Sequence, residues 1–205
     1  MVGGLLSPAE RLTSQPGRDR FRLGELVPRE VVLVNRAPVL TLWASVVAER
    51  LGYDHAASLS LGKALAGLNA QSKGRRLGIY TTPEVVEEMP PKKVGRGEQF
   101  WVKLMGRPIP AIRTGQGVRA VEGDRPIEPE GVERYLQGKF GEALESARRV
   151  MEELARTYPP EELGAKAFSL YENFRPCIQD GVRGWGAKGE LDLDCIRSLS
   201  TKGLT

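Results

Sequence analysis

The strongest apolar periodicity lies in two consecutive segments in the first half of the chain. Residues 36–51 repeat apolar side chains at helical spacing, and Gly52 then suits the left-handed position just past a helix end. Residues 55–71 repeat the same spacing after Asp54, a residue type that caps helix N-termini. The two segments therefore predict a helical hairpin. Their apolar stripes are Val39, Trp43, Val46, Val47 and Leu51 in the first helix and Leu61, Ala64, Leu65 and Leu68 in the second.

The second predicted helix contains two glycines, Gly62 and Gly67. A glycine in a helix interior costs about 1 kcal/mol relative to alanine. A helix that tolerates both is expected to approach a neighbouring element closely, because only a missing side chain allows such an approach.

Two regions favour β-structure. Residues 29–34 are rich in β-branched side chains and predict a strand. Residues 99–127 alternate apolar and polar positions, with turn signals at Gly106-Arg107 and Gly123-Asp124, and predict an antiparallel β-meander. The tips and the polar face of this meander are expected to carry Arg107, Arg113, Arg119 and Arg125.

The remainder returns to helical spacing. A last short helix around Ile196 is expected to be capped by Asp192 or Asp194. The fold class is therefore α+β: an N-terminal helical hairpin plus a small antiparallel β-meander (1–126), with a C-terminal helical part (127–205), together forming one compact unit. The other predicted helices cover residues 7–12, 82–89, 133–138, 141–158 and 161–174, and a glycine-rich loop covers 175–190.

The composition is that of an ordinary globular protein, with 40% hydrophobic and 27% charged residues. The N-terminus lacks the basic start and apolar run of a signal peptide, and no apolar run reaches the length of a membrane span. We therefore expect a cytoplasmic protein without membrane contact, whose two cysteines, Cys177 and Cys195, are thiols. Few Asn and Gln beside many Arg, Glu and Pro are typical of a bacterial protein from a thermophile or a GC-rich genome.

The charge is unevenly distributed along the chain. Residues 1–126 carry a net charge of +7 and residues 127–205 a net charge of −3, and residues 63–119 hold 11 basic but only 4 acidic residues. Clustered positive charge favours a polyanion partner such as nucleic acid, although a solubilising surface is an equally simple explanation. The candidate phosphate contacts are Lys73, Arg75, Arg76, Lys92, Lys93, Arg96, Arg107, Arg113 and Arg119, and we expect them to share one face.

The stretch "SKGRR", residues 72–76, follows the predicted second helix. The carbonyl dipole at a helix end repels anions, so only the cationic side chains could attract phosphates there. Near the C-terminus, Trp185 lies among glycines with Lys188 close by, and an exposed Trp could stack on a nucleobase. The alternative is that Trp185 packs into the core.

A helix-turn-helix is a second way to interpret the hairpin, because Ala48 and Gly52 have the spacing of that motif. A recognition helix needs long polar side chains in its first turns. Residues 55–60 offer mainly small residues instead, which favours an ordinary packed hairpin.

The sequence contains only incomplete matches to catalytic motifs. His55 is the single histidine, and the two cysteines do not form a zinc motif. Ser60 and Lys63 have the S-x-x-K spacing without its companion motifs. The G-x-G-x-x-G match at 184–189 has no room for a following βαβ unit. We therefore expect no cofactor and no metal, and favour a non-enzymatic protein.

The leading hypothesis is nucleic-acid binding through a basic face. The first alternative is a protein-interaction or structural module that uses the acidic C-terminal part, which requires an exposed apolar patch. The second is an enzyme on a small anionic substrate with an arginine clamp, which requires a concave pocket lined by titratable groups. A monomer or a weak homodimer is expected.

Overall fold

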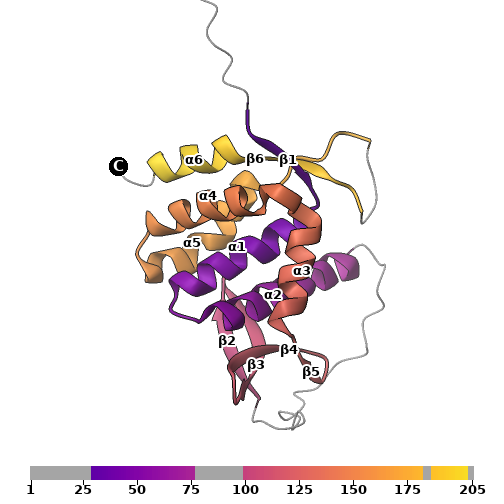
Figure 1. Ribbon diagram of the computed structural model, residues 1–205, viewed down its shortest axis with the longest axis vertical. Helices are drawn as coiled ribbons and strands as arrows, with labels where there is room; N and C mark the ends of the chain where they lie inside the picture. The colour runs from indigo at the N-terminus through magenta and orange to yellow at the C-terminus, as the bar shows by residue number, and fades with distance from the viewer. Residues whose placement is uncertain (1–28, 77–98, 182–185, 203–205) are drawn as a thin grey trace, which may run out of the picture.

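The computed structural model describes residues 29–76, 99–181 and 186–202 (Figure 1). It confirms the α+β fold class, with a helical hairpin, an antiparallel meander and C-terminal helices. In chain order the elements are β1 (Val31–Val34), α1 (Arg36–Arg50), α2 (His55–Arg76), β2 (Gln99–Leu104), β3 (Arg107–Thr114), β4 (Gly117–Glu122), β5 (Arg125–Pro126), α3 (Pro129–Phe140), a 3₁₀ turn (Gly141–Ala143), α4 (Leu144–Arg156), α5 (Pro160–Phe174), β6 (Gly189–Asp192) and α6 (Leu193–Lys202).

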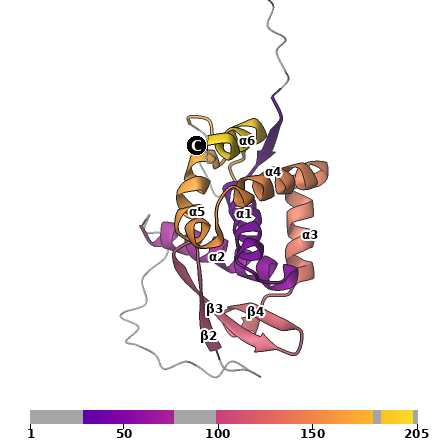
Figure 2. The ribbon, with the colours of Figure 1, turned by 90° about the vertical axis from the view of Figure 1, so that its left-hand side faces the viewer.

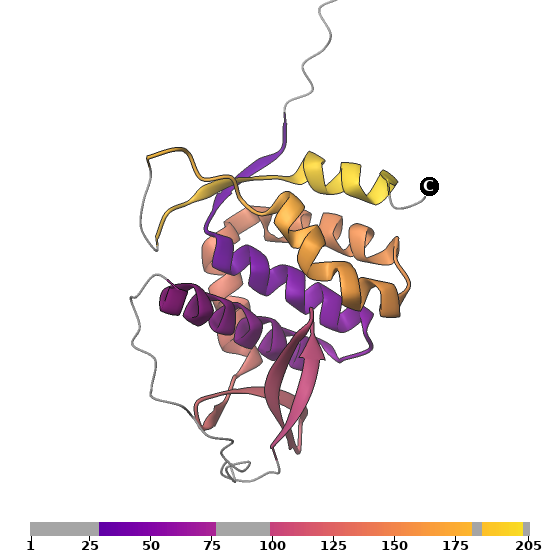
Figure 3. The same cartoon turned by 180° about the vertical axis from the view of Figure 1, so that it is seen from behind.

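The helices separate two small sheets. The four-stranded sheet β2-β3-β4-β5 lies at one end of the molecule, and the two-stranded ribbon β1-β6 lies with α6 at the other end, as all three ribbon views show (Figures 1, 2 and 3). Helix α1 runs between α2 on one side and α4 and α5 on the other. One hydrophobic core includes residues of α1, α2 and the meander together with residues of α3 to α6, so the core crosses residue 126.

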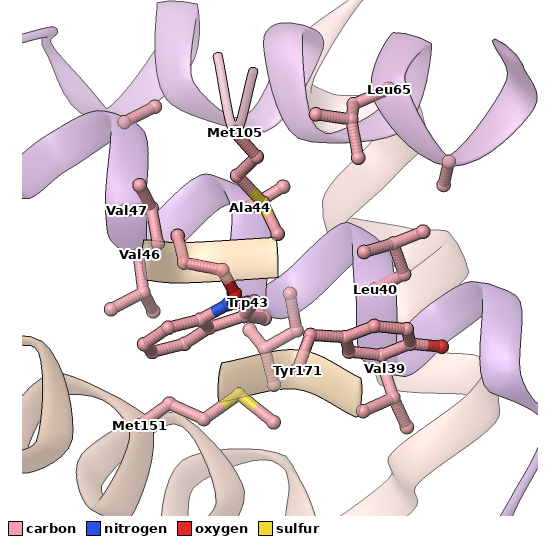
Figure 4. Packing of buried hydrophobic residues seen from close by; sticks show 14 of the residues in the cluster. Val39, Leu40, Trp43, Ala44, Val46, Val47, Leu65, Met105, Met151 and Tyr171 are labelled. Carbon is pink, nitrogen blue, oxygen red and sulfur yellow. Dashed lines mark hydrogen bonds between the residues drawn. The ribbon is translucent and has the colours of Figure 1, made fainter. Parts of the chain in front are cut away.

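Helix α1 is enclosed on all sides, and every residue from Pro38 to Ala48 is buried. Its sequence is apolar around the whole circumference, which is typical of a central helix. Trp43 fills the middle of the core, where its indole N–H donates to the Ala167 carbonyl at 2.8 Å and its ring meets Phe174 edge to face. Figure 4 shows Trp43 in one cluster with Met151, Tyr171 and Met105.

The predicted hairpin is confirmed in detail. Gly52 has a φ of +98° and donates to the Glu49 carbonyl, while Tyr53 donates to the Ala48 carbonyl, which is the Schellman pattern of a helix end. Asp54 then caps α2, because its carboxylate accepts the Ala57 N–H at 2.8 Å. Helix α2 continues to Arg76, so the "SKGRR" stretch lies in its last turns rather than after it.

The close approach predicted for the glycines is confirmed at Gly62. A Cβ atom there would lie 2.6 Å from the Thr41 carbonyl oxygen and 2.9 Å from the Ser45 nitrogen, and it would overlap the Ser45 hydroxyl. At Gly67 a Cβ atom would meet only the Glu122 carboxylate, at 3.8 Å. Helices α1 and α2 therefore cross in direct contact at Gly62, and only that glycine is required by packing.

The predicted meander is confirmed, with one turn displaced. Leu104 pairs with Arg107, so the β2–β3 turn is Met105-Gly106 and not Gly106-Arg107. Met105 and Gly106 have φ values of +49° and +78°, as the central residues of a two-residue hairpin turn require, and the Met105 side chain is buried in the core. The β3–β4 ladder ends at Ala111 because the next residue, Pro110, has no N–H to donate.

Strand β6 is an element that the sequence did not predict, since residues 189–190 fall in the predicted glycine-rich loop. It pairs antiparallel with β1, with Val31 opposite Asp192 and Val34 opposite Gly189. Asp192 also caps α6 by accepting the Cys195 N–H at 3.0 Å, which decides between the two predicted caps. The helices predicted over 7–12 and 82–89 lie outside the described residues.

We predict that Gly62→Ala lowers the free energy of unfolding by about 1–3 kcal/mol, because the new methyl group forces α1 and α2 apart. Gly67→Ala is the matched control: the same substitution in the same helix makes only an ordinary van der Waals contact with Glu122 and should raise stability by up to about 1 kcal/mol. Urea denaturation of the two variants measures the difference. Equal effects of the two substitutions would contradict a tight crossing at Gly62.

A second prediction concerns Tyr171, whose hydroxyl donates to the Arg36 carbonyl at 3.2 Å. Burial raises the pKa of Tyr171 from its ordinary value near 10 to about 12. The folded protein therefore holds the phenol proton more tightly than the unfolded chain, and this stability is complete below pH 10 and is lost as the pH rises toward 12. The loss should reach about 2–3 kcal/mol.

Unfolding free energies of wild type and Tyr171→Phe between pH 9 and pH 12 test this prediction. The advantage of wild type over the variant should shrink across this window, because the variant has no phenol to ionise. Parallel pH profiles would show that Tyr171 does not cause the alkaline loss.

Candidate nucleic-acid interface

Ion pairs divide the described part of the molecule into two regions. All ten of its ion pairs join residues in the ranges 29–55 and 133–197. None of the described residues from 56 to 132 takes part in one, although this stretch contains Lys63, Lys103, Arg107, Arg113, Arg119 and Arg125. None of the described cations of the sheet end is therefore neutralised by direct contact with a carboxylate.

The predicted basic residues occupy different places. Lys73, Arg75 and Arg76 lie in the last turns of α2, although their side chains are outside the described set, as are residues Lys92, Lys93, Arg96 and Trp185. Lys188 is exposed but precedes β6, so it lies at the end of the molecule opposite the four-stranded sheet (Figure 1).

Strand register decides where the meander arginines lie. Arg107, Arg113 and Arg125 share the side of the sheet that carries Val102 and Ala111 and packs on the helices. Arg107 donates to Ser72 and Asn69 of α2. Arg113 is exposed at the rim, with its guanidinium 5.3 Å from the centre of the Phe100 ring.

Arg119 lies on the opposite side of the sheet from the other three. It is only 6% exposed, and its guanidinium donates to the adjacent Val118 carbonyl. Because it is buried, it is not offered to an external ligand in this structure.

Trp101 on β2 is a surface feature that the sequence patterns did not bring out. Its side chain is 64% exposed, on the outer face of the sheet that points away from the helices. Lys103 is exposed two residues further along the same face. The alternation in "FWVKL" could have indicated this, because it places Phe100, Val102 and Leu104 on one face and Trp101 and Lys103 on the other.

The β1-β6 ribbon carries the other exposed large hydrophobic side chains among the described residues, Val31 at 40% and Leu33 at 62%. Directly across from them on β6 are Asp192 and Glu190. This mixed apolar and acidic face is the surface that a protein-interaction module would use.

A cleft of about 540 Å³ opens between α2, α3 and α4. Its size and its partly apolar lining are typical of small-molecule sites. The apolar lining consists of Leu42, Leu59, Leu136 and Leu144, and the polar lining of His55, Glu133, Arg134, Gln137, Glu145 and Arg148.

The polar groups of the cleft largely satisfy one another. His55 has Nδ1 2.6 Å from Glu49 and Nε2 3.1 Å from Glu133, so it donates to both only when both nitrogens carry protons. Arg148 donates to both Glu49 oxygens and to Glu152. Burial alone would lower the pKa of Arg148, but these two carboxylates raise it above its ordinary value.

An arginine clamp for a small anion is therefore not assembled in the cleft, since Arg148 is held by two carboxylates and only Arg134 remains. Ser60 and Lys63 do not form a reactive pair either. The Ser60 hydroxyl donates to the Ala57 carbonyl and accepts the Ala120 N–H, while Lys63 lies 4.1 Å from the centre of the Tyr135 ring.

The helix-turn-helix alternative fails on burial. Residues 57–62 of α2 are buried against α1 and β4, so they cannot enter a DNA groove. Within the three described ranges, no group of acidic, histidine or cysteine side chains could hold a metal ion, and no helix is long and apolar enough to span a membrane.

Comparison with known protein families, with curated proteins and with solved structures gave no match. Function is therefore inferred from the surface and the cleft themselves.

We predict that Arg148→Met lowers the free energy of unfolding by about 1–3 kcal/mol, because it leaves Glu49 and Glu152 without their shared cation in a half-buried site. The matched control is Arg156→Met, which breaks an exposed pair with the same Glu152 and should change stability by less than about 0.5 kcal/mol. Thermal and urea denaturation provide the measurement. A destabilisation by Arg156→Met as large as that by Arg148→Met would refute a special role for the Glu49–Arg148 contact.

Proposed function

We propose that this protein binds nucleic acid through the end of the molecule that carries the four-stranded sheet, without catalysing a reaction. The single observation that carries the proposal is the segregation of ion pairs. The described cations of the sheet end have no carboxylate partner, whereas every described ion pair lies in or next to the helices and the ribbon.

Unpaired cations concentrated at one end attract a polyanion more strongly than the same number of paired ones. Lys103 and Arg113 are the best described phosphate contacts, because both are exposed and neither has an ion-pair partner. The basic stretch at the end of α2 is continuous with this region, because Arg107 of β3 bonds to Ser72 and Asn69. Arg119, which is buried, and Lys188, at the far end, are left out of the proposed surface.

The double variant Lys103→Gln/Arg113→Gln should weaken binding to every nucleic-acid sequence and flatten its salt dependence. Removing one cation that touches a phosphate is expected to reduce the slope of log K against log salt by about 0.7 for a single strand or 0.9 for a duplex. Titration of the full-length protein with a labelled oligonucleotide at several salt concentrations measures this slope.

Arg156→Gln is the matched control, because Arg156 is an exposed arginine on the helical part and already pairs with Glu152. It should leave the slope unchanged. Equal weakening by the control and the double variant would mean that net charge alone drives binding. The absence of binding by wild type at low salt would reject the proposal.

A further inference from the structure

The outer face of the β2–β3 hairpin contains an aromatic side chain that the fold does not use. Trp101 is 64% exposed, while Phe100 and Val102 on either side of it point into the other face and pack with the core. A tryptophan is a large apolar surface that folded proteins normally bury. Because Trp101 lies within a strand and not at a loop tip, the backbone fixes the direction in which its side chain leaves the sheet.

We propose that Trp101 stacks on an unpaired base of a single-stranded nucleic acid, so that this face selects single strands over duplexes. The inference rests on the proposed function, because the basic sheet end supplies the attraction for the phosphates. Stacking on an aromatic side chain requires a base whose face is free, and a base in a duplex already stacks on its neighbours.

The neighbours of Trp101 fit this ligand. Pro110 of β3 lies directly opposite Trp101 in the antiparallel ladder. The Cβ atoms of two residues paired in this way are about 5 Å apart. Pro108 lies opposite Lys103, and Gln99 lies two residues before Trp101, so two prolines, one lysine and one glutamine flank the indole on this face. Proline rings add a flat apolar surface, and the Lys103 ammonium, which has no ion-pair partner, provides a cation where the backbone of a stacked strand would pass.

A proline-rich peptide is the other ligand that exposed tryptophans bind. Domains that recognise such peptides use grooves lined by several aromatic side chains. On the described part of the outer face Trp101 is the one exposed aromatic, and the exposed Lys103 beside it favours a polyanion over an uncharged peptide.

The test compares three ligands of about 15 nucleotides with wild type, Trp101→Ala and Trp101→Phe. The ligands are a labelled thymidine single strand, the same strand in a duplex, and an abasic strand with equal phosphate charge. Trp101→Ala should weaken binding to the thymidine strand about 5- to 100-fold, and Trp101→Phe, which keeps a ring, should weaken it much less. Binding to the duplex and to the abasic strand should change less than twofold.

The outcomes separate this inference from the proposed function. If wild type binds all three ligands and Trp101→Ala binds each of them with the same affinity, the stacking role is wrong, but nucleic-acid binding by the protein stands. If wild type binds none at low salt, both are wrong. Binding of an uncharged proline-rich peptide that Trp101→Ala abolishes, with no preference for the thymidine strand, would assign the face to peptides and overturn the inference. A melting curve of each variant confirms that the exposed substitution leaves the fold intact.

Discussion

The arrangement of the whole molecule depends on the direct contact between α1 and α2 at Gly62. Because no side chain separates the two helices there, α1 can be enclosed by α2 on one side and by α4 and α5 on the other. The opposite side of α2 receives the sheet, where the Ala120 N–H of β4 donates to the buried Ser60 hydroxyl. Helix α2 therefore packs against α1 on one side and against the four-stranded sheet on the other, and its distance from α1 sets the position of the sheet.

This arrangement also explains how the charges are distributed. The C-terminal helices pair acidic and basic residues within their own turns, as in Glu162 with Lys166, or across to α1, as in Arg148 with Glu49. The described acidic residues of the sheet end lie at the end of β4, in the β4–β5 turn and at the start of α3. Of the carboxylates on α4 and α5, Glu152, Glu162 and Glu172 pair with arginines or lysines on or directly after the same helices. Lys103 lies on the same face of the sheet as Trp101, whereas Arg107, Arg113 and Arg125 lie on the other face.

Local sequence signals predicted most of the fold. The period of the apolar residues located α1, α2, α4 and α5, and the glycine inside α2 predicted a close helix contact. The β2–β3 turn was misplaced by one residue because a preference for glycine at the first turn position was weighed without the burial of Met105. Strand β6 was missed because its four residues have no β-branched side chain, and the strand exists only through pairing with β1 at the other end of the chain.

The site was less predictable than the fold. Basic composition indicated a polyanion partner, but only strand register shows that Arg119 and Arg113 lie on opposite sides of the sheet. Trp185 was considered for stacking and Trp101 was not, although alternation alone separates Trp101 from the core residues beside it. The contacts of His55 with Glu49 and Glu133 join three helices, and no spacing along the chain contains that information.

The most direct test of nucleic-acid binding at the sheet end is to map a bound oligonucleotide by nuclear magnetic resonance, using the indole N–H signals of the tryptophans. A single strand is predicted to shift the Trp101 indole and the amides of β2 and β3, while the Trp43 indole, bonded to the Ala167 carbonyl inside the core, does not move. Shifts confined to the β1-β6 ribbon or to the cleft around His55, with the Trp101 signal unchanged, would contradict it.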